Sequence, residues 1–133
     1  MPDVDLEATI RAFVANAPRI KALCDKRVYA ALNLELPEGY DVVKGPALII
    51  SIRGGGANAH APLINPMLYA RSYGADPRTA WALDRALVAS LHTKKFGPVK
   101  MALLSASGQL TAETEPRWPY VFSTYRLSAA LFT

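Results

Sequence analysis

The sequence is poor in the side chains that bind metals and carry out nucleophilic catalysis. It has one cysteine, Cys24, and two histidines, His60 and His92. A single cysteine cannot form an internal disulfide, which fits a reducing compartment. Because a metal site usually takes three or four ligands, we expect no bound metal. We expect Cys24 to be a small buried hydrophobic residue rather than a nucleophile.

Long hydrophobic runs are absent too. No apolar stretch approaches the roughly 20 residues that cross a bilayer, and the first segment, MPDVDLEATIRAF, is acidic before it is apolar. A secretory signal has a basic region followed by a long apolar one. We therefore expect a soluble protein made in the cytoplasm, with no membrane partner.

The excess of positive charge is small. Fifteen Lys and Arg oppose eleven Asp and Glu, which gives a net charge of +4. Nucleic-acid-binding proteins usually gather their basic residues in one patch or on one helix face, whereas the longest basic run here is Lys94–Lys95. We interpret the excess as a solvated surface and expect no specific nucleic-acid binding.

The composition is that of one globular domain spanning residues 1–133. The hydrophobic fraction is 51% and the charged fraction is 20%, which excludes an intrinsically disordered chain. A domain of this size buries roughly two thirds of its unfolded surface, so it can fold without a disulfide or a metal.

Three helices are expected. Apolar residues at three- and four-residue spacing indicate an amphipathic helix over residues 5–16, and Pro18 can open a short helix over residues 19–24. The best-marked helix covers residues 77–95, where Asp76 is a good N-cap. In this helix the expected buried positions are Ala80, Leu83, Leu87 and Leu91, with Trp81 and Val88 on the flank, Asp84 on the exposed face, and Lys94 and Lys95 in the last turn.

Runs with two-residue alternation predict strands. They cover residues 47–53, 66–73, 99–105 and 120–132; Val28-Tyr29 fits a further short strand, and residues 106–117 are typical of a polar turn region. Two hairpins then flank the main helix. This order predicts an α+β fold, a mostly antiparallel sheet of about four strands with two main helices packed against it.

Three successive glycines, Gly54, Gly55 and Gly56, open a long connection that runs to Pro66. A phosphate-binding loop needs a Lys and a Ser or Thr after its last glycine and then a helix. Here Ala-Asn-Ala-His follows and the chain enters a strand, so we interpret the segment as a flexible hairpin tip rather than an anion site.

No arrangement typical of an active site is present. There is no G-x-S-x-G motif, so a serine nucleophile lacks its usual support. Glu113 and Glu115 lie two residues apart in a polar loop, and with Asp84 they are expected to be solvated carboxylates. His60 and His92 have few candidate partners. We expect the protein not to be an enzyme.

Aromatic residues cluster around the last strand, and two interpretations are open for them. The cluster comprises Trp118, Tyr120, Phe122 and Tyr125 with Tyr69 and Tyr73, interleaved with Arg71, Arg117 and Arg126. Such residues can form a base-stacking platform. They can equally be core and interface residues, because Tyr, Trp and Arg are common anchors of protein interfaces. We favour the second interpretation, since no known RNA-binding motif is present.

Short phrases in a fixed order also carry a family resemblance. They are Lys26-Arg27-Val28-Tyr29, Pro-Ala-Leu-Ile-Ile-Ser at 46–51, Met-Leu-Tyr-Ala-Arg-Ser at 67–72, an Ala-rich helix at 79–91 before a Gly-Pro turn, and Arg117-Trp118 with Val121-Phe122-Ser123. Over about Leu6 to Leu131, their order and spacing resemble the tail terminator (tail completion) proteins of long-tailed bacteriophages and related prophage elements.

The resemblance implies a structural protein of the virion. Members of that family form a homo-oligomeric ring, commonly hexameric, at the head-proximal end of the tail tube. The ring ends polymerisation of the tail tube protein and presents a surface to the head connector or stopper protein. The family fold is α+β, with no catalytic residue and no cofactor.

On this basis we expect the subunit and tube interface in and beside the glycine-rich connection. The residues concerned are Arg53, Gly54, Gly55, Gly56, Asn58, His60 and Arg71. A loop without any contact is the alternative for this segment. For the whole chain, the alternatives are another head–tail joining subunit (a connector or stopper) and a small nucleic-acid-binding domain.

Overall fold

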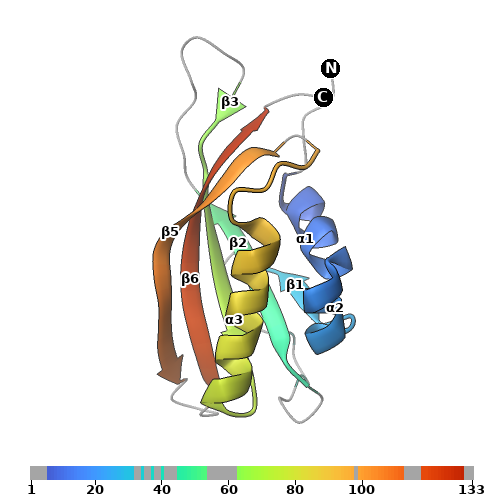
Figure 1. Cartoon of the computed structure of the whole chain (residues 1–133), viewed down its shortest axis with the longest axis vertical. Coiled ribbons are helices and arrows are strands. Elements are labelled where there is room, and N and C mark those ends of the chain that lie inside the picture. Colours follow the sequence, from blue (N-terminus) through green and yellow to red (C-terminus); the bar gives the residue numbers. More distant parts are fainter. Residues whose placement is uncertain are drawn as a thin grey trace.

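The computed structural model describes residues 6–31, 34, 37, 40, 45–53, 63–97, 99–112 and 118–130. The helices in these parts are α1 (Leu6–Asn16), α2 (Pro18–Cys24) and α3 (Pro77–Leu91). The strands are β1 (Val28–Ala30), β2 (Ala47–Arg53), β3 (Leu63–Ile64), β4 (Met67–Tyr73), β5 (Val99–Ala112) and β6 (Pro119–Ala130). The helices lie against one side of the sheet (Figure 1).

The strands form one six-stranded sheet in the order β1-β2-β4-β6, with β3 and β5 also paired to β6. β1 is parallel to β2, and all other pairs are antiparallel. The expected α+β class and the mostly antiparallel pairing are confirmed. The expected number of about four strands was too low, because the sheet also includes the short strands β1, of three residues, and β3, of two residues. The sequence indicated β1 at Val28-Tyr29, but a two-residue strand such as β3 leaves no alternation to detect.

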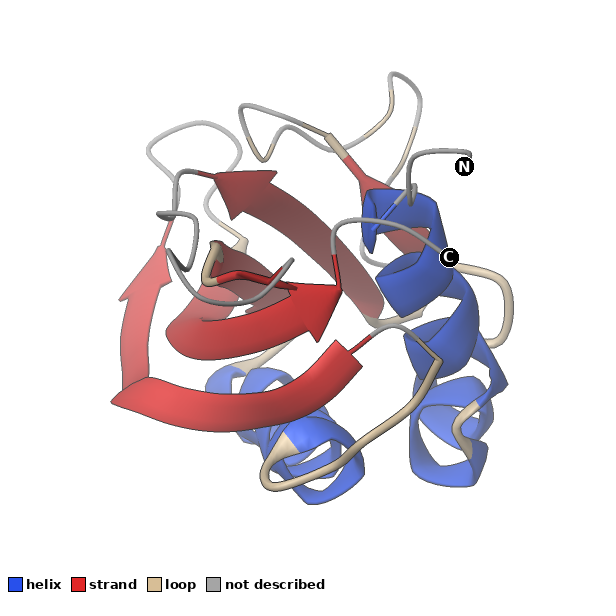
Figure 2. Ribbon diagram, turned by 90° about the horizontal axis from the view of Figure 1, so that it is seen from above, coloured by secondary structure: helices blue, strands red, loops and turns tan. Residues whose placement is uncertain are grey.

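The helices lie on one side of the sheet in the view from above (Figure 2), and the main core lies between them and that face of the sheet. It comprises, among others, Ile10, Ile20, Leu83 and Leu87 from the helices and Leu48, Ile50, Leu68, Tyr125 and Leu127 from the strands. Each fully buried Leu or Ile of this set contributes about 1.5–3 kcal/mol of hydrophobic stabilisation. The predicted buried stripe of α3 is therefore confirmed.

α3 is shorter than predicted. It ends at Leu91, and His92 is already extended, with φ −60° and ψ 126°. Thr93 then adopts a positive φ of 63° and donates its N–H to the Ala102 carbonyl on β5 at 2.7 Å. The predicted place of Lys94 and Lys95 in the last turn was wrong, because the helix ends at Leu91 and the hydrogen bond from Thr93 to β5 replaces a further helical turn.

β5 is longer than predicted. The stretch 106–112, expected to belong to a polar turn, continues the strand and pairs with β6 up to Ala112↔Pro119. The ladder has register shifts between Leu104 and Ala106 and between Ala106 and Gln109. Such β-bulges let a strand stay paired where its sequence alternation breaks down. The break in alternation at these bulges therefore hid the strand in the sequence.

The sheet face away from the helices has a smaller core of its own. We call this side the second face. Here Ile49 and Tyr73 are fully buried, and Leu34 and Tyr40, from the connection after β1, pack close by. Tyr40 donates its hydroxyl hydrogen to the Gly45 carbonyl. Leu34 and Tyr40, from the connection between β1 and β2, thus pack against one end of the second face.

Candidate interaction surfaces

Within the described parts of the chain, no group of three or more His, Cys, Asp or Glu side chains lies close enough to hold a metal ion. Cys24 is fully buried, and burial raises the pKa of its thiol to about 12, with the nearby Arg27 acting weakly in the opposite direction. The thiol is therefore neutral and out of reach of solvent. No described helix has the length and apolarity needed to span a membrane.

Asp84 does not lie where the sequence predicts. The residue is 4% exposed and accepts a hydrogen bond from the Ser123 hydroxyl of β6. Burial raises the pKa of the Asp84 carboxyl, although the hydrogen bond from Ser123 and the charge of Arg85 act against this rise. Burial, and secondly the charge of Asp84, raise the pKa of the Tyr125 hydroxyl. The predicted solvated position of Asp84 was wrong; it forms a polar link between α3 and β6.

The open end of the second face carries a row of four side chains, one from each of four neighbouring strands. The register pairs Arg53 with Met67, Met67 with Arg126, and Arg126 with Leu103. Arg53 and Arg126 are exposed, Leu103 is 42% exposed, and Met67 is half-buried. We call these four residues the Arg-Met row. Two cations thus alternate with two apolar side chains across the sheet.

A third apolar side chain, Met101, borders this row. Met101 lies two residues before Leu103 on β5, pairs with Ser128 and is 40% exposed. A hollow of about 170 Å³ is lined here by Asn65, Met101, Leu103, Arg126, Leu127 and Ser128. The edge of the sheet at β5 therefore presents apolar surface beside the Arg126 guanidinium.

The structure separates the two arginines that were expected to act together at the base of the glycine-rich connection. Arg53 is the last residue of β2, and its guanidinium lies 5.6 Å from the centre of the Tyr69 ring. Arg71 lies in the middle of β4, half-buried, 4.8 Å from the centre of the Tyr120 ring. Both lie on the second face, but Arg71 belongs to its covered half. The other expected interface residues, Gly54, Gly55, Gly56, Asn58 and His60, lie outside the described residues.

The aromatic cluster divides between the two faces. Tyr125 faces the helices and is fully buried. On the second face, Tyr69 stacks on Phe122 with ring centres 6.0 Å apart, and Tyr73 contacts Tyr120 at 5.1 Å. Trp118 meets Tyr40 edge to face at 5.6 Å. The rings largely contact one another, which agrees with the core part of the interpretation favoured above.

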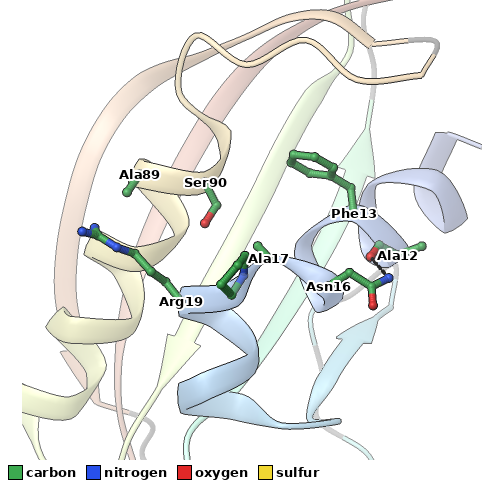
Figure 3. A pocket seen from close by; sticks show the side chains of 8 residues that line it. Ala12, Phe13, Asn16, Ala17, Arg19, Ala89 and Ser90 are labelled. Atoms are coloured by element: carbon green, nitrogen blue, oxygen red, sulfur yellow. Dashed lines mark hydrogen bonds between the residues drawn. The ribbon is translucent and has the colours of Figure 1, made fainter.

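A groove lies on the helical side of the described structure. It has a volume of about 890 Å³ and lies between the junction of α1 and α2 and the surface of α3. Figure 3 shows its lining of Ala12, Phe13, Asn16, Ala17, Arg19, Ala89 and Ser90; Pro18 completes it. Asn16 and Ser90 donate to carbonyls of their own helices, both at 2.8 Å. The lining is therefore mainly apolar, with the Arg19 cation on one wall, and it contains no group suited to acid–base catalysis.

Sequence reasoning named Arg53 and Arg126 separately but did not bring them together with Met67 and Leu103. Alternation in Met67–Tyr73 indicates which side chains share a face of β4. A row across four strands depends on their pairing register, and register is set by turn lengths and long-range packing. The sequence did offer one signal for an interaction surface here: Met101 and Leu103 are apolar and lie two residues apart in a strand.

Comparison with known proteins gives a likeness of fold to solved structures. No family model matches the chain, and no curated protein matches it. Among solved structures, the fold is similar to that of a chain in "Virion of native gene transfer agent (GTA) particle", with a TM-score of 0.69 and 14% sequence identity. The similarity covers 94% of this chain and 94% of that chain. At this identity the likeness establishes a shared fold.

Proposed function

We propose that the protein is a structural subunit of a phage-like virion. Specifically, it forms the ring that caps the head-proximal end of the tail tube, ends tube polymerisation and joins the tail to the head connector. The observation that carries the proposal is the likeness of fold to a virion chain over 94% of both chains. The phrases at 26–29, 46–51 and 67–72, which resemble tail terminator proteins, support the finer assignment.

The surfaces fit a subunit of an assembly. A ring with cyclic symmetry uses heterologous contacts, so each subunit needs two different complementary surfaces. The chain offers an apolar groove on the helical side and the Arg-Met row on the second face. Both combine apolar side chains with arginine, a combination common at protein interfaces. The role proposed for the chain is therefore structural rather than catalytic.

Electron microscopy tests this proposal. The purified protein is imaged alone and mixed with tail tubes, which are assembled from the tube protein encoded by the same phage or prophage. We expect rings in solution or on tubes, and antibody label at a single end of each tube. Tubes assembled with the protein present should stop growing, whereas tubes without it continue. Label along the tube wall, or at no point of the tube, would contradict the capping role.

The same images separate the runner-up within virion assembly. A connector or stopper subunit would bind isolated head portals and leave the tube end unlabelled. A tail terminator would label the tube end in the absence of heads.

We also propose that the glycine-rich connection from Gly54 to Pro66 takes part in the contact with a neighbouring subunit or with the tail tube. Deleting residues 55–61, which leaves Gly54 and Pro62 between Arg53 of β2 and Leu63 of β3, tests that role in a variant shown to be folded. We expect the deletion variant to fold but to cap tubes poorly. Normal assembly and capping by this variant would exclude the connection from the interface.

A nucleic-acid-binding function is the second candidate, because the chain carries fifteen basic and eleven acidic side chains and a cluster of aromatic residues around its last strand. Phosphate contacts weaken steeply as salt concentration rises. Retention of DNA or RNA that is strong at low salt and lost at physiological salt, without ring formation, would favour this candidate over the structural one.

A further inference from the structure

The two edges of the described sheet are formed by β1 and β5, which lie on opposite sides of it (Figure 1). β1 is parallel to β2, and each step from β2 to β4, from β4 to β6 and from β6 to β5 reverses the strand direction. β5 therefore runs opposite to β1. If a second copy is placed beside the first by rotation about an axis along the strands, β5 of one copy meets β1 of the other as an antiparallel pair.

In β1, alternate residues turn their backbone groups away from β2. Ala31 donates its N–H to the Ile50 carbonyl of β2 at 3.1 Å, so the odd-numbered residues of this strand bond to β2. The N–H and C=O groups of Val28 and Ala30 therefore point outward. The Val28 carbonyl accepts from the Arg11 guanidinium at 3.3 Å, and the other three groups have no partner within the described part of the chain.

One part of the outer edge of β5 is covered by its own subunit. The Ala102 carbonyl accepts from the Thr93 N–H at 2.7 Å, and the Leu104 N–H donates to His92 Nδ1 at 3.0 Å. Such contacts protect an edge strand from pairing with another chain. They exclude a partner strand from this part of β5.

The other end of β5 has an outward-facing backbone as well. After the last register shift, Leu110 pairs with Val121 and Ala112 pairs with Pro119. The Pro119 carbonyl accepts from the Gly74 N–H on the β4 side of β6, so the odd-numbered residues of β6 bond toward β4. Their partners on β5 then face away from β6. Leu110 and Ala112 therefore present their N–H and C=O groups at the outer edge.

The side chains at these two edges lie on the same face of the sheet. Leu110 shares the face of its partner Val121, and Ser123, two residues further along, bonds to α3 on the helical side. Ala30 pairs with Ile50, which belongs to the core beneath the helices. Residues opposite each other in an antiparallel pair share both the direction of their backbone groups and the face of their side chains. Leu110 and Ala30 agree in both respects.

The edge at β1 also has room for a side chain. A hollow of about 420 Å³ is lined by Arg11, Val28, Tyr29, Ala30, Ala31 and Pro37. Arg11 belongs to α1, so this hollow opens on the helical side, the side on which Leu110 lies. Leu110 is 44% exposed in the single chain. An exposed leucine on one edge thus matches an apolar hollow on the other.

We propose that the end of β5 of one copy pairs with β1 of a second copy, with Leu110 opposite Ala30 and Ala112 opposite Val28. Each opposed pair exchanges N–H and C=O groups, and Leu110 enters the hollow beside Arg11. The inference rests on the proposed function, because it assigns a contact by which subunits of the ring join. The contact is heterologous, and its repetition about an axis along the strands closes a ring with the helices of all copies on the same side.

A charge at Leu110 tests the contact. We expect Leu110→Lys to weaken self-association by at least about tenfold, because the ammonium group would be buried beside Arg11. Leu103→Lys is the matched control, since Leu103 is 42% exposed on the same strand but lies on the second face. It should leave self-association in the absence of tail tubes unchanged. Association is measured by light scattering and analytical ultracentrifugation over a concentration series, and circular dichroism confirms that both variants are folded.

Cysteine cross-linking tests the pairing itself. Cα atoms of hydrogen-bonded residues in an antiparallel pair lie about 5.5 Å apart, which a disulfide can bridge. The variant with Leu110→Cys and Ala30→Cys should form a ladder of covalent oligomers under mild oxidation on a non-reducing gel. Each single variant should stay monomeric on that gel. The native Cys24 is fully buried and adds little background.

The contrary outcomes are distinct. Dimers formed by Leu110→Cys alone would show that β5 pairs with β5 of a two-fold-related copy, which overturns the proposal. If the original protein forms rings, but the double variant does not cross-link and Leu110→Lys associates normally, this contact is wrong and the proposed ring stands. If the original protein never associates, even on tail tubes, both the contact and the ring fail.

Discussion

The Ser123 hydroxyl donates a hydrogen bond to the Asp84 carboxyl in the buried layer between β6 and α3. An ionised carboxyl is costly to bury, and it is retained where hydrogen bonds or nearby charges compensate. Here one hydroxyl supplies a hydrogen bond, and Arg85 supplies the nearby positive charge. The resulting balance makes the helix–sheet contact sensitive to pH.

The first prediction concerns Asp84→Asn. Burial raises the folded-state pKa of Asp84 above its ordinary value of 3.8, so as pH rises the unfolded chain loses the proton first. The neutral carboxyl therefore adds to the free energy of unfolding. This contribution is fully present below pH 3.8 and is lost as pH rises from 3.8 to the raised pKa. Asparagine can accept the same hydrogen bond without titrating. We expect Asp84→Asn to gain stability relative to the original protein between about pH 3 and pH 7 in urea unfolding. A difference in unfolding free energy between Asp84→Asn and the original protein that does not vary with pH would contradict a raised pKa for Asp84.

The second prediction concerns Ser123→Ala. Removing the hydroxyl leaves the buried Asp84 carboxyl without its Ser123 donor, which should lower the free energy of unfolding by about 1–3 kcal/mol. It should also raise the Asp84 pKa further, because this hydrogen bond favours the ionised form. Thr124→Ala, at the half-buried neighbouring position, serves as the control. Equal losses for both variants would show that the hydrogen bond contributes little.

The third prediction concerns the start of α3. Asp76 Oδ1 accepts from the Thr79 N–H at 2.8 Å and from the Thr79 hydroxyl at 2.9 Å. The backbone hydrogen bond is the main cause of a lowered Asp76 pKa. We expect Asp76→Ala to lower Tm at neutral pH, and the difference to shrink as pH falls through the lowered pKa. Asp76→Asn keeps the capping hydrogen bond without the charge, so we expect it to lower Tm by less than Asp76→Ala does. This pH dependence is opposite in sign to that of Asp84.

The fourth prediction concerns Gly74, between β4 and α3. A Cβ atom there would lie 2.7 Å from the Ala80 nitrogen and 2.8 Å from the Thr79 Cβ. The first turn of α3 would have to move, so Gly74→Ala should cost about 1–3 kcal/mol of stability in urea unfolding. Ala75→Ser, at the exposed neighbouring position, should change it by less than about 0.5 kcal/mol. Gly74→Ala without loss would mean that this close approach is not required.

The fifth prediction concerns Cys24. Its thiol is fully buried, and its pKa is raised to about 12, so little thiolate is present near neutral pH. A thiol reagent such as Ellman's reagent should react with the folded protein at a rate set by unfolding, and should react quickly in urea. Fast reaction of the folded protein would show that α2 opens readily.

Local chemistry was enough to predict several features of the fold. Asp76 and Pro77 define the start of α3 by hydrogen bonding and by the fixed φ of proline, both within one turn. The spacing of Ala80, Leu83 and Leu87 identifies the buried side of that helix. Asp84 also lies on this buried side, but a charge is assigned to the surface unless its partner is known, and Ser123 is 39 residues away.

The sequence by itself determined the α+β class, the hairpins and the buried stripe of α3, because periodicity and capping act between residues close in the chain. The tertiary structure decided the rest. α3 ends at Leu91 because Thr93 bonds to Ala102 on β5. The Arg-Met row exists because pairing register aligns Arg53, Met67, Arg126 and Leu103, which lie up to 73 positions apart in the sequence. Register depends on long-range packing, and no local pattern encodes it.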